Sequence, residues 1–356
     1  MNSVDRFIQV MNFQPVDHPP IVIDVPWPRT KDRWRQEGWN PDIPLYEFFK
    51  IDPLALVNVS PETRLHPPFE RRVLEQSERF TIFIDHRGVK CLTATDYEEG
   101  IHYLEYPIRG NADRPWLEKR LDPDDAGRWK NGWDQRLAGI DPRTDLGLLD
   151  FGSFFGDLHE RMGTEAVSLI YYDEPDFVLW YNDRIAACVE RAIARILPDP
   201  RVKLMGGHED MAFKNGSFIS PAMFREFMTP YYRRTVTAAR RRGQTIFWQD
   251  SDGNVETLIP LWLEVGVNLI TPLEVAAGMD VVRLRAEYGK SLLMLGGIDK
   301  RALIAGPEAI RKELLSKKSV IEGGGYIPRL DHTISPDISW PNYQYYINLL
   351  KGMYGF

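Results

Sequence analysis

The sequence predicts an α/β fold, a (β/α)8 TIM barrel with an antiparallel hairpin insertion near the N-terminal third. Short apolar runs alternate with helical stretches along most of the chain, which is typical of parallel strands joined by helices. Several of these runs end in carboxylates, and α/β enzymes place their chemistry at the carboxyl ends of buried strands. A barrel with insertions fills 356 residues without a second core, so we expect one domain, residues 1–356.

The N-terminal part contains the first predicted helix and the first two predicted strands. Residues 2–13 have apolar side chains at helical spacing, and several prolines end this helix. Residues 21–24 and 54–59 are short apolar runs that we predict to be buried strands. The segment 26–50 is rich in Trp and Pro. It covers either the mouth of a pocket or a subunit interface, which leaves a homodimer as an open alternative.

Residues 69–109 interrupt this alternation of strands and helices. They contain three short runs of alternating apolar and polar residues, and residues 85–88 supply a turn between the last two runs. We therefore predict an antiparallel hairpin inserted into the barrel. Residues 110–145 are polar and contain prolines, and Asp122-Pro123 predicts the start of a helix there.

From residue 146 onward, strands and helices alternate regularly. The remaining predicted strands lie near 146–151, 202–207, 245–250, 267–272, 292–297 and 325–330. The predicted helices span 175–197, 221–242, 254–265, 279–288 and 307–320, and Ser220-Pro221 is a typical helix start. Together with the two N-terminal strands this makes eight, a number that favours a closed barrel over an open doubly wound sheet.

The composition argues against several classes of function and leaves a small-molecule substrate as the expected ligand. The formal net charge of −7, with acidic and basic residues well mixed, argues against nucleic-acid binding. No apolar run approaches the roughly 20 residues of a membrane span, and the N-terminus has no signal-peptide pattern, so we expect no membrane attachment and a cytoplasmic location. Cys91 and Cys188 cannot by themselves form a disulfide framework or a thiolate metal cluster.

Polar residues at strand ends are the predicted catalytic group. Asp250 and Asp252 follow the fifth predicted strand two residues apart, a spacing that in an extended chain suits a metal ion or a shared proton. Asp252 alternatively caps the next helix. Asp210 follows the fourth strand, where we expect one of three neighbouring titratable groups to face the pocket and the others to face solvent. His332 follows the last strand beside another acid and would serve as a ligand or a proton shuttle.

Five further residues are predicted to contact the substrate. Glu274 and Asp299 end two more strands and complete an acidic rim, although each could instead be the buried partner of an arginine. Lys214 lies in a loop, where it is either a surface residue or a group that binds an anionic substrate. Arg29 is the other placed cation, and Trp27 belongs to the Trp-rich segment.

Several segments together resemble the uroporphyrinogen decarboxylase superfamily. Residues 219–227 resemble the Ser-Pro-x-x-Phe segment that follows the fourth-strand acid of that family, which would be Asp210. Residues 297–303 resemble its Gly-Asn-Leu-Asp-Pro-x-x-Leu segment. The Gly-Gly-Tyr-Ile run at 324–327 and the Pro-Asn-Tyr at 341–343 resemble its last strand and helix. The resemblance implies a βα barrel, in agreement with the strand count.

The departures from the family pattern bear on the substrate and on a metal. The family's Arg-Gln-Ala-Gly-Arg stretch, which grips substrate carboxylates, is absent, and residues 26–29 read Pro-Trp-Pro-Arg in that neighbourhood. The superfamily also contains corrinoid-dependent methyltransferases that bind zinc through a His-x-Cys pair, which would fall on Asp250 and Asp252. The resemblance therefore implies an oxygen-rich site in which these two acids and His332 hold a divalent metal, zinc or another.

The resemblance implies an enzyme from a branch related to these methyltransferases. The expected reaction is methyl transfer between a small methylated substrate, for example a methoxylated one, and a corrinoid carried by a partner protein. Asp210 and Lys214 would position the substrate. Two alternatives stay open: a decarboxylase of uroporphyrinogen or a related carboxylated substrate, and a non-catalytic barrel that binds a small molecule.

Overall fold

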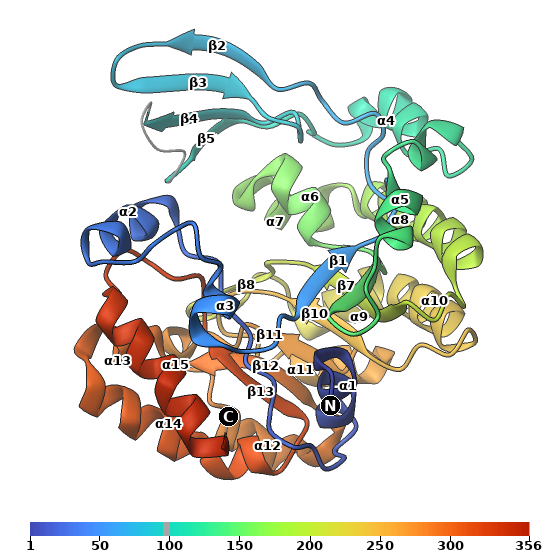
Figure 1. The fold of residues 1–356 in the computed structure, drawn as a ribbon. Helices are drawn as coiled ribbons and strands as arrows, with labels where there is room; N and C mark the ends of the chain where they lie inside the picture. The colour runs from blue at the N-terminus through green and yellow to red at the C-terminus, as the bar shows by residue number, and fades with distance from the viewer. Residues whose placement is uncertain (95–99, 356) are drawn as a thin grey trace.

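The computed structural model describes residues 1–94 and 100–355, and a curled sheet of seven parallel strands forms its centre (Figure 1). The strand order is β1-β6-β7-β10-β11-β12-β13. The strands are β1 (Ala55–Asn58), β6 (Asp145–Asp150), β7 (Val202–His208), β10 (Phe247–Asp250), β11 (Leu269–Thr271), β12 (Leu293–Ile298) and β13 (Tyr326–Leu330). The α/β class and seven of the predicted strands are confirmed.

The first predicted strand, residues 21–24, is not a strand in the structure. This segment contacts β13 through the side chain of Asp24. Asp24 Oδ2 accepts a hydrogen bond from the Leu330 backbone N–H at 3.3 Å, and the Asp24 carboxylate pairs with Arg329. Pro26 makes a single parallel bridge to the segment after β13. Proline has no N–H to donate to a strand ladder, which limits pairing here. The closed barrel of eight strands is therefore not confirmed.

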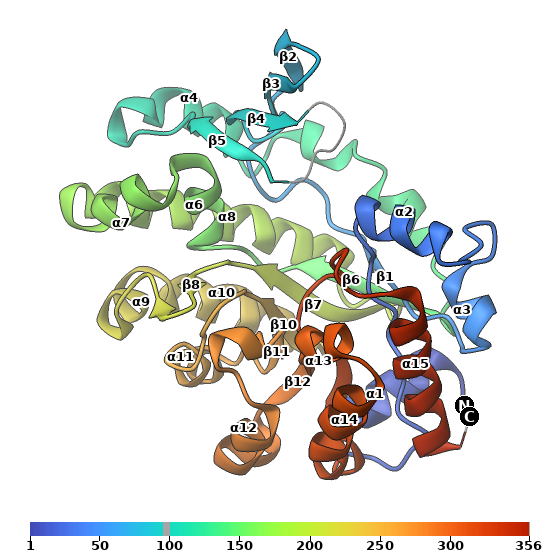
Figure 2. The same cartoon turned by 90° about the vertical axis from the view of Figure 1, so that its left-hand side faces the viewer.

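Helices cover the outer face of the sheet, as Figure 2 shows from a second side. They include α8 (Pro175–Ile196), α9 (Pro221–Phe227), α10 (Thr229–Arg240), α11 (Ile259–Val265), α12 (Val281–Tyr288), α13 (Lys300–Ala305), α14 (Pro307–Glu322) and α15 (Trp340–Tyr354). The predicted cap is confirmed, because Ser220 Oγ accepts from the Met223 N–H at 3.2 Å. The helix predicted at 221–242 is two helices, since Pro230 cannot donate the hydrogen bond that a continuous helix needs.

The inner face of the sheet is filled at the amino ends of the strands. Helix α1 (Ser3–Met11) lies there, and the N–H of Gly325, just before β13, donates to its Val10 carbonyl at 2.7 Å. Its buried side chains pack against inward-facing strand residues: Leu146, Leu148, Leu204, Ile246, Leu269, Leu293, Leu295 and Ile327. The alternate strand residues pack against the helices. Because α1 fills the inner face at the amino ends, the inner face of the sheet is open at the carboxyl ends of the strands.

The predicted insertion is confirmed as a four-stranded antiparallel sheet that projects from the rest of the molecule (Figure 1). Its strands are β2 (Arg72–Gln76), β3 (Phe80–Ile84), β4 (Lys90–Ala94) and β5 (His102–Glu105). The turn predicted at residues 85–88 joins β3 to β4. Asp85 Oδ1 stabilises it by accepting hydrogen bonds from the N–H groups of Arg87, at 2.9 Å, and Val89, at 3.0 Å.

Shorter elements connect the strands. They are α2 (Pro28–Gln36), α3 (Leu45–Phe49), η1 (Asn111–Asp113), α4 (Arg114–Arg120), η2 (Ala126–Trp129), α5 (Trp133–Ala138), α6 (Gly156–Met162), α7 (Thr164–Asp173), β8 (Ala212–Phe213), β9 (Gly216–Ser217), η3 (Val275–Ala277) and η4 (Gly289–Ser291). The prediction that a helix starts at Asp122-Pro123 is wrong. The turn η2 starts later, where Asp125 accepts from the Gly127 N–H at 2.7 Å.

The Trp-rich segment divides between core and surface. Trp34 is fully buried against α15, with its ring centroid 4.8 Å from that of Tyr343, and Trp39 is also buried. Trp27 is 37% exposed. Of the three tryptophans only Trp27 therefore keeps the surface position that a pocket cover or an interface would need, and Ile43, Tyr46 and Phe48 of the same segment are exposed with it. Among the helices that the structure describes, none combines the length and the apolar character needed to cross a membrane.

Candidate functional site

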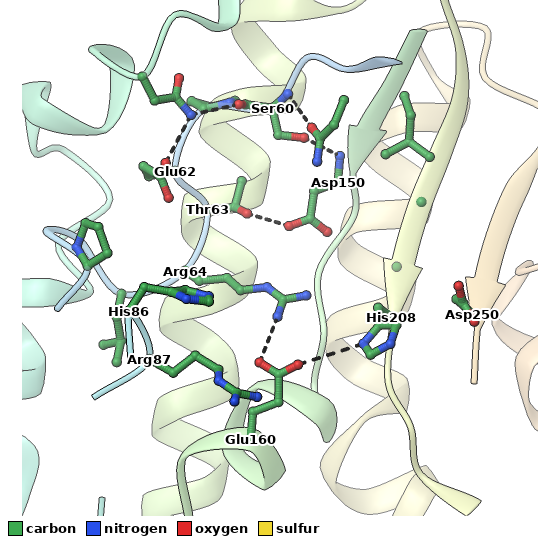
Figure 3. Close-up of a pocket in the computed structure, with 18 of the residues that line it drawn as sticks. Ser60, Glu62, Thr63, Arg64, His86, Arg87, Asp150, Glu160, His208 and Asp250 are labelled. Atoms are coloured by element: carbon green, nitrogen blue, oxygen red, sulfur yellow. Dashed lines mark hydrogen bonds and ion pairs between the residues drawn. The ribbon is translucent and has the colours of Figure 1, made fainter. Parts of the chain in front are cut away.

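A cavity of about 880 Å³ opens at the carboxyl ends of β1, β6, β7 and β10 (Figure 3). Its floor includes the apolar side chains Val57, Leu148 and Trp248. Its polar lining comes from the loop after β1, from the insertion turn, from α5 and the residues before it, from α6 and from the strand ends: Asn58, Ser60, Glu62, Thr63, Arg64, His86, Arg87, Asn131, Arg136, Asp150, Glu160, Arg161, His208 and Asp250. An apolar floor with a few convergent polar groups is typical of a small-molecule site.

Strand alternation explains why Asp150, His208 and Asp250 line the cavity. In β6, β7 and β10 each of these residues is an even number of positions after an inward-facing core residue: Leu148, Leu204 and Ile246 respectively. A period of two therefore turns all three side chains inward, one layer above the apolar floor. The same rule turns Glu209 outward. We expected the neighbours of the pocket-facing group to face solvent. Glu209 does not, because it is fully buried on the helix side of the sheet.

Asp250 is the one predicted catalytic residue that lines the cavity. Burial is the largest cause that raises its pKa to about 6, and the neighbouring charges of Asp252 and Asp210 raise it further. The charges of His208 and Arg329 act in the opposite direction. A carboxyl group with this pKa keeps its proton in mildly acidic solution and can serve as a general acid.

His208, Glu160 and Arg64 form a row of widely spaced polar side chains across the cavity (Figure 3). His208 Nδ1 lies 4.0 Å from Glu160 Oε1, and Arg64 Nη1 lies 3.7 Å from Glu160 Oε2. On its other side, His208 Nε2 lies 3.4 Å from Asp210 Oδ2. These separations are longer than those of good hydrogen bonds, so the polar atoms can still bind a ligand.

The loop that carries Arg64 is held through its backbone. The guanidinium of Arg128, which is 2% exposed, donates to the carbonyl oxygens of Glu62 at 2.9 Å and of Arg64 at 2.6 Å. Arg136 Nη2 donates to the Ser60 carbonyl at 2.9 Å. Because the main chain is bonded at these points, the Arg64 side chain starts from a fixed position.

A second polar group surrounds His332 outside the cavity lining. His332 Nε2 lies 3.3 Å from Asp252 Oδ2, Thr333 Oγ1 lies 2.9 Å from His332 Nδ1, and Trp27 Nε1 donates to Thr333 Oγ1 at 2.6 Å. The Thr333 hydroxyl can donate to Nδ1 while accepting from Trp27, which leaves the proton of neutral His332 on Nε2, facing Asp252. Asp210 Oδ1 accepts from the Asp252 N–H at 3.2 Å and so joins this group.

The pKa directions in this second group follow from the His332–Asp252 pair. The hydrogen bond that His332 donates to Asp252 is the largest cause that raises the pKa of His332, and burial opposes it. For Asp252, burial is the largest single influence and raises the pKa, but the hydrogen bond and the charge of His332, with the charges of His208 and Lys300, lower it overall. The pair therefore favours a charged imidazolium and a carboxylate.

The other predicted substrate contacts lie away from the cavity lining. Glu274 Oε2 accepts from the Gly253 N–H at 3.1 Å. Asp299 caps α13 and pairs with Arg301 at 2.8 Å, so for Asp299 the alternative of an arginine partner holds. Lys214, in the turn between β8 and β9, and Arg29, at the start of α2, are exposed.

The predicted metal ligands do not form a centre. Among residues 1–94 and 100–355, no group of three His, Cys, Asp or Glu side chains could hold a metal ion. Asp252 contacts His332, whereas Asp250 lines the cavity. Both cysteines are buried, Cys91 in the insertion and Cys188 in α8, so neither adds a thiolate. This donor set does not fit the expected divalent metal, and no step of the chemistry is derived through one.

Sequence reasoning missed Arg64, Arg87 and Glu160. Arg64 and Arg87 lie in loops, where no periodicity predicts a direction, and Glu160 lies on a short helix. His208 could have been found, because its position relative to Leu204 predicts an inward side chain.

Comparisons with known proteins match mainly the C-terminal part of the chain, which contributes His208, Trp248 and Asp250 to the cavity lining. The family model described as "Uroporphyrinogen decarboxylase (URO-D)" matches residues 208–353. A uroporphyrinogen decarboxylase from Xanthomonas euvesicatoria is 31% identical over 137 residues, which are 35% of this chain and 36% of that protein. One from Pseudomonas syringae pv. syringae is 28% identical over 186 residues, 50% of this chain and 49% of that protein. The resemblance to this superfamily is confirmed.

These matches are partial, since the chain spans about half the length, or less, of the curated relatives it matches. Among solved structures, a methyltransferase from Methanosarcina mazei matches over 100% of both chains, with a TM-score of 0.59 and 13% sequence identity. At this identity the match shows that the two chains share a fold. The chain is therefore similar in part of its sequence to uroporphyrinogen decarboxylases and shares its fold with the Methanosarcina mazei protein.

Proposed function

We propose that this chain is an enzyme that transfers a methyl group from a small methylated substrate to a corrinoid carried by a partner protein, with Asp250 as the proton donor. The observation that carries the proposal is the position of Asp250 beside an apolar floor in an open cavity, with its pKa raised to about 6. The superfamily resemblance and the methyltransferase of the same fold support an enzyme in this class.

The chemistry requires a proton because the oxygen of a methoxyl group is a poor leaving group. When the bond between the methyl carbon and the oxygen breaks, its electron pair stays on the oxygen. Protonated Asp250 gives its proton to that oxygen, becomes a carboxylate, and regains a proton from solvent. A corrinoid on the partner supplies the nucleophile that accepts the methyl group. The cavity, at about 880 Å³, has the size of a small-molecule pocket, so the partner would meet the substrate at its mouth.

The test is demethylation of methoxylated aromatic compounds in the presence of reduced free cobalamin. We expect the corresponding phenol to form together with a change in the visible spectrum of the cobalamin. Asp250→Asn should abolish both signals, whereas Asp124→Asn, at an exposed acid far along the chain, should leave them unchanged. Phenol formation that is equally fast in Asp250→Asn would exclude Asp250 as the proton donor.

A second candidate is decarboxylation, which the names of the curated relatives favour. Asp250 would then protonate the carbon that loses carbon dioxide, while arginines hold the other carboxylates of the substrate. Arg29 and Lys214 do not line the cavity, but Arg64 and Arg87 do. Release of carbon dioxide from uroporphyrinogen by the purified protein, lost in Asp250→Asn, would replace the methyl-transfer proposal.

A further inference from the structure

The guanidinium of Arg64 has spare hydrogen-bond donors that face the cavity. Within the described residues it makes no hydrogen bond, and its nearest acceptors are Asp157 Oδ1 at 3.5 Å and Glu160 Oε2 at 3.7 Å. The side chain is 27% exposed. By contrast, Arg136 donates from all three guanidinium nitrogens to backbone carbonyls at 2.6–2.9 Å. The N–H donors that Arg136 uses for backbone carbonyls are therefore still available in Arg64.

The nearest acceptor of Arg64 is already bonded to other groups. Asp157 is fully buried, accepts a hydrogen bond from the Tyr181 hydroxyl at 2.5 Å and pairs with Arg161. A carboxylate with these two partners has little need of a third. Since the Arg64 main chain is fixed by Arg128, the side chain is presented by a rigid loop and its donors point into a cavity.

Arg87 brings a second guanidinium to the same cavity from the insertion. Its Nε and Nη2 both pair with Asp85 Oδ2, at 2.8 and 2.7 Å, and Asp85 also holds the turn. Figure 3 shows Arg87 beside Glu160, on the same side of the cavity as Arg64. The antiparallel insertion therefore does more than project from the seven-stranded sheet, because its turn supplies part of the cavity wall.

We propose that Arg64 and Arg87 form a binding subsite for a carboxylate group, so that the substrate is a small carboxylate whose reacting methoxyl end reaches Asp250. This inference rests on the proposed function and names its substrate class. A planar guanidinium matches the two oxygens of a carboxylate, which forms charge-assisted hydrogen bonds with it. The apolar floor formed by Val57, Leu148 and Trp248 receives the body of the substrate between its two polar ends.

The test measures binding and does not depend on turnover. The dissociation constants of a methoxybenzoate and of the matching uncharged methoxybenzamide are compared by calorimetry. We expect Arg64→Gln to weaken the methoxybenzoate by about tenfold or more and to leave the methoxybenzamide unchanged. Arg64→Lys keeps the charge but not the planar fork, so its loss should be intermediate. Arg143→Gln, at an arginine whose side chain is 74% exposed, is the matched control.

The outcomes separate the subsite from the reaction. Equal weakening of both probes in Arg64→Gln, no weakening of either, or no binding of the methoxybenzoate by the unsubstituted protein would overturn the subsite. Carboxylate binding that depends on Arg64, without any demethylation, would support the subsite and remove the methyl-transfer proposal. Demethylation that depends on Asp250 but is unchanged in Arg64→Gln would support the methyl-transfer proposal and remove the subsite. Thermal melting of each variant checks that it is folded.

Discussion

The two halves of the rim differ in how their charged side chains are partnered. Around β1, β6, β7 and β10, the polar atoms of Glu160 lie 3.7 Å from Arg64 and 4.0 Å from His208 across a cavity. Around β11, β12 and β13, the acids are bonded: Asp331 is fully buried and accepts from the N–H groups of Val275 at 3.0 Å and Lys300 at 3.1 Å.

This difference teaches that acids at strand ends do not by themselves locate a site. Buried polar groups that have hydrogen-bond partners hold loops in place, whereas groups whose partners lie too far away are free to bind a ligand. We therefore assign the substrate to the open half and a structural role to the closed half. The predictions below test that assignment.

The largest expected effect is on activity in the open half. Asp250→Asn should lower the kcat/KM for the substrate by about 100-fold or more, because a general acid contributes at least that factor. In the unsubstituted protein, kcat/KM should fall as the pH rises through about 6, since the protonated form of Asp250 is then lost. A pH–rate profile of both proteins checks this. A profile for Asp250→Asn with the same fall would contradict the assignment.

In the closed half, the largest effect should be on stability. Asp331→Ala removes the acceptor of two backbone N–H groups, and we expect the free energy of unfolding to fall by about 2–4 kcal/mol. Urea denaturation measures this change. Asp124→Asn, at an exposed acid, is the control and should change it by less than about 0.5 kcal/mol. If Asp331→Ala changed the free energy of unfolding as little as Asp124→Asn does, the acids would not stabilise the closed half.

The His332–Asp252 pair should make a smaller and pH-dependent contribution. The pKa of His332 is raised in the folded protein, so the stability that the pair provides is fully present below about pH 6.5 and is lost as the pH rises through the folded-state pKa. Both side chains are partly exposed, which limits the effect to less than about 1 kcal/mol. Urea denaturation of His332→Gln and the unsubstituted protein, at pH values on either side of this range, should show the difference only on the acidic side.

Trp27→Phe should give the smallest effect. It removes the donor to Thr333 Oγ1 but keeps an aromatic ring at this partly exposed position. We expect a change in the free energy of unfolding of about 0.5 kcal/mol, the low end for a hydrogen bond because this one is exposed, and unchanged binding of the methoxybenzoate. Weakened binding measured by calorimetry would show that the two halves of the rim act together on the substrate.

Several parts of the fold could be predicted because their causes are local. The apolar runs that became β6, β7, β10, β11, β12 and β13 are short and bounded by turns, and Ser220 caps a helix through its own side chain. The turn at residues 85–88 follows from Asp85 and a glycine. Residues 21–24 read as a strand for the same reasons, but β13 is contacted there by the Asp24 side chain and not by a strand ladder.

The sequence by itself determined the parallel strands, the insertion and the inward direction of Asp250, since strand alternation depends only on local backbone geometry. The tertiary structure alone decided which charges meet. Arg64 and Arg87 come from loops far apart in the chain, and their approach to Glu160 depends on how Arg128 and Asp85 hold those loops. It also decided that Asp252 contacts His332 and does not line the cavity beside Asp250, because Asp252 lies beyond the end of β10 and no longer follows the alternation of the strand.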